Sequence, residues 1–400
     1  MRMKIVKMPL FLNINDIVKK IYLIDIGLII FLCGFVFIEP SLVEYLMVIS
    51  VPLLFLKGKV YVFPLFAGMF LLLVNLLNVL LFVNYSLMAS FEVNFLFLVK
   101  NVYMLFIFLF FAATSLDRGK KNLLRLIFNL WTLSVLVNVL AYLFGVFLSK
   151  KMLFGAHVVN YGIRFEGFFK DPNVLGPFIV VPLIYWIYRC FERCNTEILS
   201  IIGILFFALF FTFSRGAYLN FTIAFLFIFV VFSRRKGSNS FKPLLLSLLV
   251  ILVFFIIIWI LNPSIFGINV QMFVRNRLKI LEPYDVYRFR AQKEAFEIVK
   301  QFPIFGIGVG NYNTFVHYAA HNTYLRLLGE QGLLGFSAYL LFFVAVLFDR
   351  GRILIKKVER GFFEYAVIYG CFLGILTESF FIDTLHWRHL WILLGLLFAI

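Results

Sequence analysis

A few cationic side chains are the residues whose types could do chemistry in an otherwise apolar chain. Arg215 lies between two apolar runs, in Phe-Thr-Phe-Ser-Arg-Gly-Ala-Tyr. An arginine at membrane depth marks a functional site by default, although a helix-end side chain snorkelling to headgroups leaves the same pattern. Arg164 precedes another apolar run, and Arg288 and Arg290 lie in a long polar stretch. Because guanidinium groups bind phosphate through paired hydrogen bonds, these residues point to an anionic ligand.

His321 is the one candidate base near these cations, since it opens His-Asn-Thr-Tyr-Leu directly before an apolar run. Imidazole titrates near neutral pH and can accept a proton during catalysis. A histidine that only hydrogen-bonds a loop carbonyl would give the same sequence. His317 lies four residues earlier, as in a zinc pair, but no third ligand is evident. We therefore expect no metal and no other cofactor.

The glycine run at Gly306, Gly308 and Gly310 superficially resembles a nucleotide-binding loop. A dinucleotide fingerprint needs a preceding strand within a βαβ unit, and this run follows Phe-Pro and leads into an apolar segment. We reject the nucleotide interpretation. A turn that brings backbone close to a ligand or to a neighbouring helix remains possible.

The composition describes the scaffold that must position these residues. Of 400 residues, 63% are hydrophobic and 14% are charged, against about 45–50% and 25% in soluble domains. The net charge of +17 is divided among short clusters between apolar runs, which suits anionic lipid better than nucleic acid. We predict an all-α, polytopic integral membrane protein whose residues 1–400 form a single transmembrane domain.

About twelve transmembrane helices are expected, because a bilayer core needs about 20 apolar residues per helix. They lie near 21–38, 41–56, 60–83, 93–114, 126–147, 174–189, 198–214, 217–233, 243–262, 322–348, 362–380 and 389–400.

Orientation follows from the lysines and arginines, which concentrate in cytoplasmic segments. If the N-terminus is inside, the inner segments hold the majority of the 37 basic residues, so both termini should be cytoplasmic. Cys190 and Cys194 flank one of these inner loops, where thiols remain reduced.

One long loop, residues 263–320, should therefore lie on the outer face. Its stretch 287–299 places Phe289, Phe296 and Val299 near one helical face, which predicts an amphipathic surface helix. Arg164, Arg215, Arg288 and His321 also fall on the outer side in this topology. An outer-face phosphate would belong to a lipid-linked substrate, because nucleotide sugars are cytoplasmic.

The sequence from about residue 160 to residue 340 resembles the O-antigen ligase and O-antigen polymerase superfamily. The resemblance rests on five segments in order: Arg164-Phe-Glu-Gly-Phe-Phe-Lys-Asp-Pro-Asn173, Ser214-Arg215-Gly216, Arg288 four residues before Gln292-Lys-Glu-Ala-Phe, Pro303-Ile-Phe-Gly306-Ile-Gly308-Val-Gly310-Asn311, and His321-Asn-Thr-Tyr-Leu through Glu330-x-Gly332 to Gly335.

The resemblance implies a GT-C-type glycosyltransferase of the bacterial cytoplasmic (inner) membrane, acting without a metal on undecaprenyl-diphosphate-linked glycan. His321 would deprotonate the acceptor hydroxyl, and direct attack would invert the anomeric centre. Arg215 and Arg288 would hold the diphosphate, with Arg164 as a third contact. Where relatives carry Trp this chain has Gln292, so Arg290 could take the place of Arg288.

Three functions remain open from the sequence. A polymerase joins the glycan to another lipid-linked repeat, whereas a ligase transfers it to a lipid A-core acceptor. We favour the polymerase, because nothing in the chain indicates an outer membrane. A lipid-linked oligosaccharide flippase would share the spans and cations, but transporters often carry internal repeats, and none is visible between the two halves.

The topology is testable by cysteine labelling of intact cells. Cysteines placed after Lys121, Lys236 and Lys357 should react only once the membrane is permeabilised, whereas cysteines within 270–310 should react with an impermeant reagent from outside. Labelling of 270–310 from the cytoplasmic side alone would contradict the proposed outer location of the site.

Overall fold

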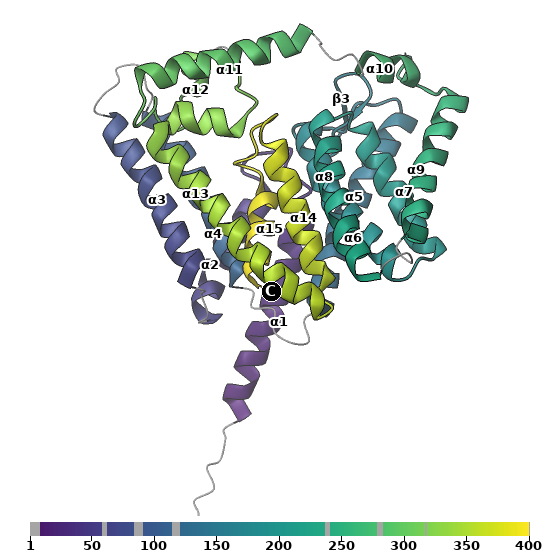
Figure 1. Cartoon of the computed structure of the whole chain (residues 1–400), viewed down its shortest axis with the longest axis horizontal. Helices are drawn as coiled ribbons and strands as arrows, with labels where there is room; N and C mark the ends of the chain where they lie inside the picture. The colour runs from purple at the N-terminus through teal and green to yellow at the C-terminus, as the bar shows by residue number, and fades with distance from the viewer. Residues whose placement is uncertain are drawn as a thin grey trace, which may run out of the picture.

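The computed structural model describes residues 9–57, 62–83, 91–113, 121–236, 241–277, 283–316 and 318–399, and it is predominantly helical (Figure 1). The helices are α1 (Pro9–Leu32), α2 (Leu42–Lys57), α3 (Val62–Val83), α4 (Phe91–Ala112), α5 (Lys121–Phe147), α6 (Pro172–Glu192), α7 (Thr196–Phe211), α8 (Arg215–Lys236), α9 (Phe241–Leu261), α10 (Val270–Arg277), α11 (Pro283–Gln301), α12 (Tyr312–Phe315), α13 (Thr323–Glu359), α14 (Phe363–Glu378) and α15 (Arg388–Ala399).

The protein is a multi-pass membrane protein, as its composition predicts. Each of the twelve expected stretches contains a helix. Within the described ranges, six helices (α3, α4, α5, α6, α8 and α13) are long and apolar enough to cross a bilayer, and shorter apolar helices accompany them. Many large apolar side chains on these helices point outward; Leu140 of α5, for example, is 65% exposed. Hydrocarbon, not water, is the solvent that suits such a surface.

The start of α1 and the end of α15 lie on the same side of the molecule. Figure 1 shows the start of α1 and the C-terminus at the bottom, whereas α10, α11 and α12 lie at the top. The start of α1 and the end of α15 therefore lie opposite to the segment that carries α10, α11 and α12.

The centre of the fold is α14, which packs against α6, α8, α13 and α15. Close contact with α8 depends on Gly374, because a Cβ atom there would collide with Asn220. The pairing of these two helices brings the start of α8 beside the end of α14, where Glu378 lies. Both ends contribute to the site described below.

Three short antiparallel ribbons were not predicted from the sequence. They pair β1 (Met152–Leu153) with β2 (Ala156–His157), β3 (Val159–Asn160) with β4 (Arg164–Phe165), and β5 (Ser264–Ile265) with β6 (Ile268–Asn269). Strands of two residues are too short to leave an alternating pattern of apolar and polar residues.

The predicted surface helix exists as α11, and a second face of small residues, not predicted from the sequence, packs on the protein. Ala291, Ala295 and Ile298 are buried against the protein, whereas Phe289 and Phe296 are 54% and 52% exposed. The small alanines let α11 approach the segment that carries Tyr312, and the aromatic side chains are left on the other face.

Cys190 and Cys194 differ from the prediction of reduced thiols, since the structure joins them as a disulfide. Cys190 lies in the last turn of α6 and Cys194 just beyond its end. The chain turn after Glu192 brings their Cα atoms within 4.2 Å.

The most unusual backbone feature is a break in α13 at Gly332, where φ is 62° and ψ is −165°. Beyond the break, the Leu333 and Leu334 amides donate to the Pro303 and Ile304 carbonyls at 2.8 and 3.1 Å instead of to their own helix.

The carbonyls that the break releases are also used. Gly329 accepts from the Ile307 amide at 3.0 Å and Glu330 from the Gly308 amide at 2.8 Å. The glycine run is therefore inserted into the break in α13. Gly306, Gly308 and Gly310 all have positive φ, as a turn in close contact with a helix requires.

Gly332→Ala should destabilise the protein, because φ and ψ at this position are accessible almost only to glycine. The backbone strain alone costs about 1–3 kcal/mol, and a Cβ atom would collide with the Ile304 carbonyl. Thermal unfolding of the purified protein measures the effect. Gly68→Ala in α3 is the matched control, since its Cβ atom would meet the Leu109 side chain at an ordinary 3.8 Å. Equal melting temperatures for both variants would contradict the role of the break.

Candidate functional site

A cavity of about 680 Å³ lies where α6, α8, α11 and α14 come together with the segment before α13. It contains four of the five residues that the sequence analysis singled out. The described residues that line it are Tyr161, Arg164, Asp171, Asn173, Phe213, Ser214, Arg215, Gly216, Leu219, Arg277, Arg288, Phe289, Gln292, His321, Glu378, Phe380, Phe381 and Ile382.

Arg164 is the most firmly held of the arginines. It comes from β4, is 4% exposed, and donates from Nε to the Thr212 carbonyl at 2.7 Å and from Nη2 to Asn173 Oδ1 at 2.8 Å. Burial, and then the charge of Arg277, lower the pKa of Arg164 to about 10. The guanidinium therefore remains charged at neutral pH, and its fixed position forms one wall of the cavity.

Arg215 is the first residue of α8, so its side chain and the helix N-terminus present positive charge to the same space. The chain enters α8 through Phe213, which has a φ of 48°, and Ser214, whose hydroxyl accepts from the Ala217 amide at 3.3 Å. Unlike Arg164, Arg215 is exposed, so its side chain can reach a ligand.

Arg277 and Arg288 line the cavity from the end of α10 and from α11. With Arg164 and Arg215 they make four arginines, against two carboxyl groups, among the described residues of the lining. A cavity with this excess of positive charge and partly apolar walls suits an anion, because electrostatic attraction is strengthened where water is excluded.

His321 stands at the edge of this cavity in a strained backbone conformation, with φ of 44°. Non-glycine residues adopt positive φ at some cost, and such residues concentrate at functional sites. Burial, followed by the nearby charge of Arg288, lowers the pKa of His321 to about 4, although Asp383 opposes the shift. The imidazole is therefore neutral at pH 7 and can accept a proton.

The position of His321 is fixed from both of its sides. The Ala320 carbonyl accepts from Gln292 Nε2 of α11 at 3.5 Å, and the Thr323 amide donates to the Ser379 carbonyl at 2.9 Å. The Thr323 hydroxyl also contacts the Thr384 hydroxyl at 3.2 Å. These contacts bind the start of α13 to the end of α14, which carries Glu378.

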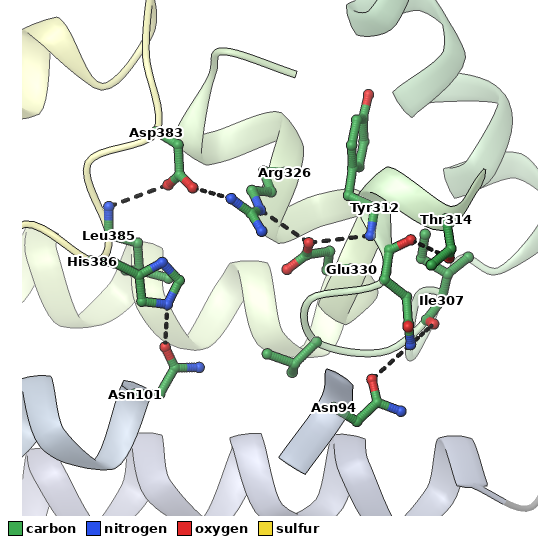
Figure 2. Close-up of polar contacts among 12 residues, drawn as sticks. Asn94, Asn101, Ile307, Tyr312, Thr314, Arg326, Glu330, Asp383, Leu385 and His386 are labelled. Carbon is green, nitrogen blue, oxygen red and sulfur yellow. Dashed lines mark hydrogen bonds and ion pairs between the residues drawn. The ribbon is translucent and has the colours of Figure 1, made fainter. Parts of the chain in front are cut away.

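A partly buried ionic chain supports this segment (Figure 2). Arg326 Nε donates to Glu330 Oε1 at 2.9 Å, and Arg326 also pairs with Asp383. Glu330 in turn accepts from the Tyr312 amide at 3.3 Å, and Asp383 from the Leu385 amide at 3.3 Å. The chain thus joins α12, the first turns of α13 and the loop after α14 around His321.

Arg290 lies outside the cavity. Its side chain is 73% exposed and pairs with Glu294 of the same helix at 3.1 Å. Side chains two positions apart on a helix point to different faces. Arg288 of α11 therefore lines the cavity, whereas Arg290 does not. His317, the possible zinc partner, lies outside the described residues.

Sequence reasoning missed two residues of the lining as site residues. Arg277 lies at the end of α10, within the expected outer loop 263–320, and it was not singled out from the sequence. Glu378 is fully buried at the end of α14 and accepts from Asn220 Nδ2 at 2.9 Å. A carboxylate at the end of an apolar run is a weak signal, because only the pairing of α14 with α8 brings it to the cavity.

The fold is a multi-pass helical scaffold, and its cationic cavity suits an anionic ligand. Residues 200–340 match a sequence family described as O-antigen ligase, and these residues form a domain of that family. The matched range contains Arg215, Arg288, Arg290 and His321 but not Arg164. The match assigns this part of the chain to the membrane glycosyltransferases of the O-antigen ligase and polymerase type, a family of lipopolysaccharide and polysaccharide biosynthesis whose substrates are lipid-linked glycans. No curated protein matches the chain.

Proposed function

We propose that the chain polymerises undecaprenyl-diphosphate-linked glycan at the outer face of the cytoplasmic membrane, with both termini in the cytoplasm. The observation that supports this most strongly is the gathering of Arg164, Arg215, Arg288 and His321 on one cavity from four separate segments of the chain. Ligation to lipid A-core would use the same donor and the same chemistry.

The donor diphosphate binds between Arg215 and Arg288 in this proposal. Planar guanidinium groups match phosphate oxygens, and the N-terminus of α8 adds its partial positive charge. Arg164 is held by Thr212 and Asn173, so it contributes a fixed charge from the wall. Apolar surfaces of the surrounding spans accommodate the polyprenyl tail.

The reaction is a direct displacement at the anomeric carbon. The acceptor hydroxyl oxygen forms the new glycosidic bond while the bond from the anomeric carbon to the diphosphate oxygen breaks. The electron pair of the broken bond leaves with undecaprenyl diphosphate, whose growing charge the arginines stabilise. The hydroxyl proton passes to His321, and attack from the opposite face inverts the configuration.

The pKa of His321 fits this role once the donor is bound. In the free protein its pKa is about 4, partly because of Arg288. A bound diphosphate compensates the charge of Arg288 and so raises the pKa of His321 toward the ordinary value. The base is then neutral before the reaction and stronger in the complex than in the free protein.

His321→Asn tests the base while keeping the backbone, since asparagine tolerates positive φ better than most residues. Loss of a general base typically costs about 10²–10⁴-fold in rate. Turnover of undecaprenyl-diphosphate-linked glycan by the purified protein should fall by that factor, with an unchanged melting temperature. In the wild type, kcat/KM should fall as the pH drops through about 4, because His321 becomes protonated there. Near-normal turnover of His321→Asn would show a purely structural histidine.

Arg215→Lys and Arg288→Lys test whether paired hydrogen bonds to phosphate are needed, or only a positive charge. Lysine keeps the charge but loses the planar pair of donors, so both substitutions should lower activity substantially. Arg290→Lys is the matched control from the same helix and should behave as the wild type, because Arg290 lies outside the cavity. The assay supplies only undecaprenyl-diphosphate-linked glycan, so polymer formed without lipid A-core supports the polymerase over the ligase. Full activity of both cavity variants would contradict the proposed diphosphate contacts.

A further inference from the structure

A second, smaller cavity of about 170 Å³ lies against the other side of the His321 segment. His321, Asp171 and Ile382 line both cavities, so the proposed base stands where the two spaces meet. A volume of about 10–15 Å³ already holds one water, so the smaller cavity admits a polar group well beyond a single solvent molecule. A base with access to two spaces can take a proton from one while the leaving group occupies the other.

The two cavities differ in charge. In the described lining of the smaller cavity, Arg326 is the one arginine or lysine, and it is already paired with Glu330 and Asp383. Asp171 and Asp383 also line this space, and Asp383 already accepts from Arg326 and from the Leu385 amide. A second diphosphate is therefore disfavoured there, whereas a neutral polyhydroxyl group finds acceptors for its hydroxyl protons.

The remaining walls fit the same chemistry. Trp387 lines the smaller cavity and is only 6% exposed, and Asn313 adds an amide from an exposed position. The negative face of an indole ring attracts the slightly positive C–H groups on one face of a sugar, and the amide both donates and accepts hydrogen bonds. An aromatic platform with carboxylates and an amide suits a sugar ring.

We propose that the smaller cavity is the acceptor subsite, which holds the sugar whose hydroxyl attacks the donor, while the larger cavity holds the donor diphosphate. This inference rests on the proposed function. The acceptor hydroxyl enters beside Asp171 and Asp383, gives its proton to His321 and forms the new bond to the anomeric carbon at the junction of the cavities. Separate spaces also keep the acceptor's own diphosphate away from the arginines.

Filling the smaller cavity tests the proposal without removing any polar contact. Ala319 is exposed and lines this cavity but not the larger one, so Ala319→Phe should fold normally and exclude the acceptor sugar. Lys293→Phe is the matched control, because it places the same ring on an exposed position of α11 that lines neither cavity. Trp387→Leu is the second variant, which removes the aromatic platform and leaves the space open.

The full-length protein in nanodiscs is assayed in two ways. Binding of undecaprenyl diphosphate, which carries no glycan, should stay within about twofold of the wild type in all three variants. Formation of polymer from undecaprenyl-diphosphate-linked glycan should fall about 10²-fold in Ala319→Phe, the typical effect of misplacing a reactant by about 1 Å. Polymer formation by Trp387→Leu should also fall, whereas Lys293→Phe should match the wild type. In Ala319→Phe and Trp387→Leu, hydrolysis to free glycan should become a larger share of the products.

Wild-type polymer formation by Ala319→Phe would overturn the acceptor subsite and leave the proposed function intact. Loss of undecaprenyl diphosphate binding in Ala319→Phe would also overturn it, because the smaller cavity would then belong to the donor site. If the wild type itself binds undecaprenyl diphosphate but forms no product from the lipid-linked glycan, the proposed function fails, and the subsite fails with it.

Discussion

Like charges held close together are the constraint on which this site depends. Arg164, Arg215, Arg277 and Arg288 line one cavity, against the carboxyl groups of Asp171 and Glu378. Two charges 4 Å apart interact by about 4 kcal/mol at the effective dielectric constant near a protein surface. The fold must hold the arginines against this repulsion, and a bound anion relieves it. Burial, and after it the same repulsion, lowers the pKa values of Arg164 and His321, so the protonation of the base is linked to the charge of the ligand.

The scaffold meets this constraint by fixing the cavity walls through backbone groups. Arg164 is anchored on the Thr212 carbonyl, and the Thr323 amide on the Ser379 carbonyl. The break at Gly332 exchanges hydrogen bonds within α13 for hydrogen bonds to the glycine run, so the loop carrying α12 is joined to the helix that follows His321. The ionic chain from Glu330 through Arg326 to Asp383 then fixes the first turns of α13 against the loop after α14. Rigid positioning of this kind is what a displacement reaction requires of its base and its anion site.

Most of the helices and most of the candidate site residues could be predicted from the sequence, because apolar runs and basic clusters are local signals. Every expected span contains a helix, and the arginines and histidine chosen by type and context, except Arg290, line one cavity. What could not be predicted depends on contacts between distant segments. Glu378 reaches the site only through the close pairing of α14 with α8, and the buried face of α11 is decided by the small alanines that fit against Tyr312. The choice of Arg288 over Arg290 needed the rotation of α11 about its axis, which an ambiguous apolar pattern did not determine.

The central claim is that the arginine-lined cavity binds the diphosphate of a polyprenyl-linked donor. An experimentally determined structure of the full-length protein with undecaprenyl diphosphate in a nanodisc tests it most directly. The account predicts phosphate oxygens within about 4 Å of the Arg215 and Arg288 guanidinium groups, with His321 beside the bound group. A diphosphate bound outside this cavity, or one that contacts Arg290 while Arg215 and Arg288 remain distant from it, would contradict the account.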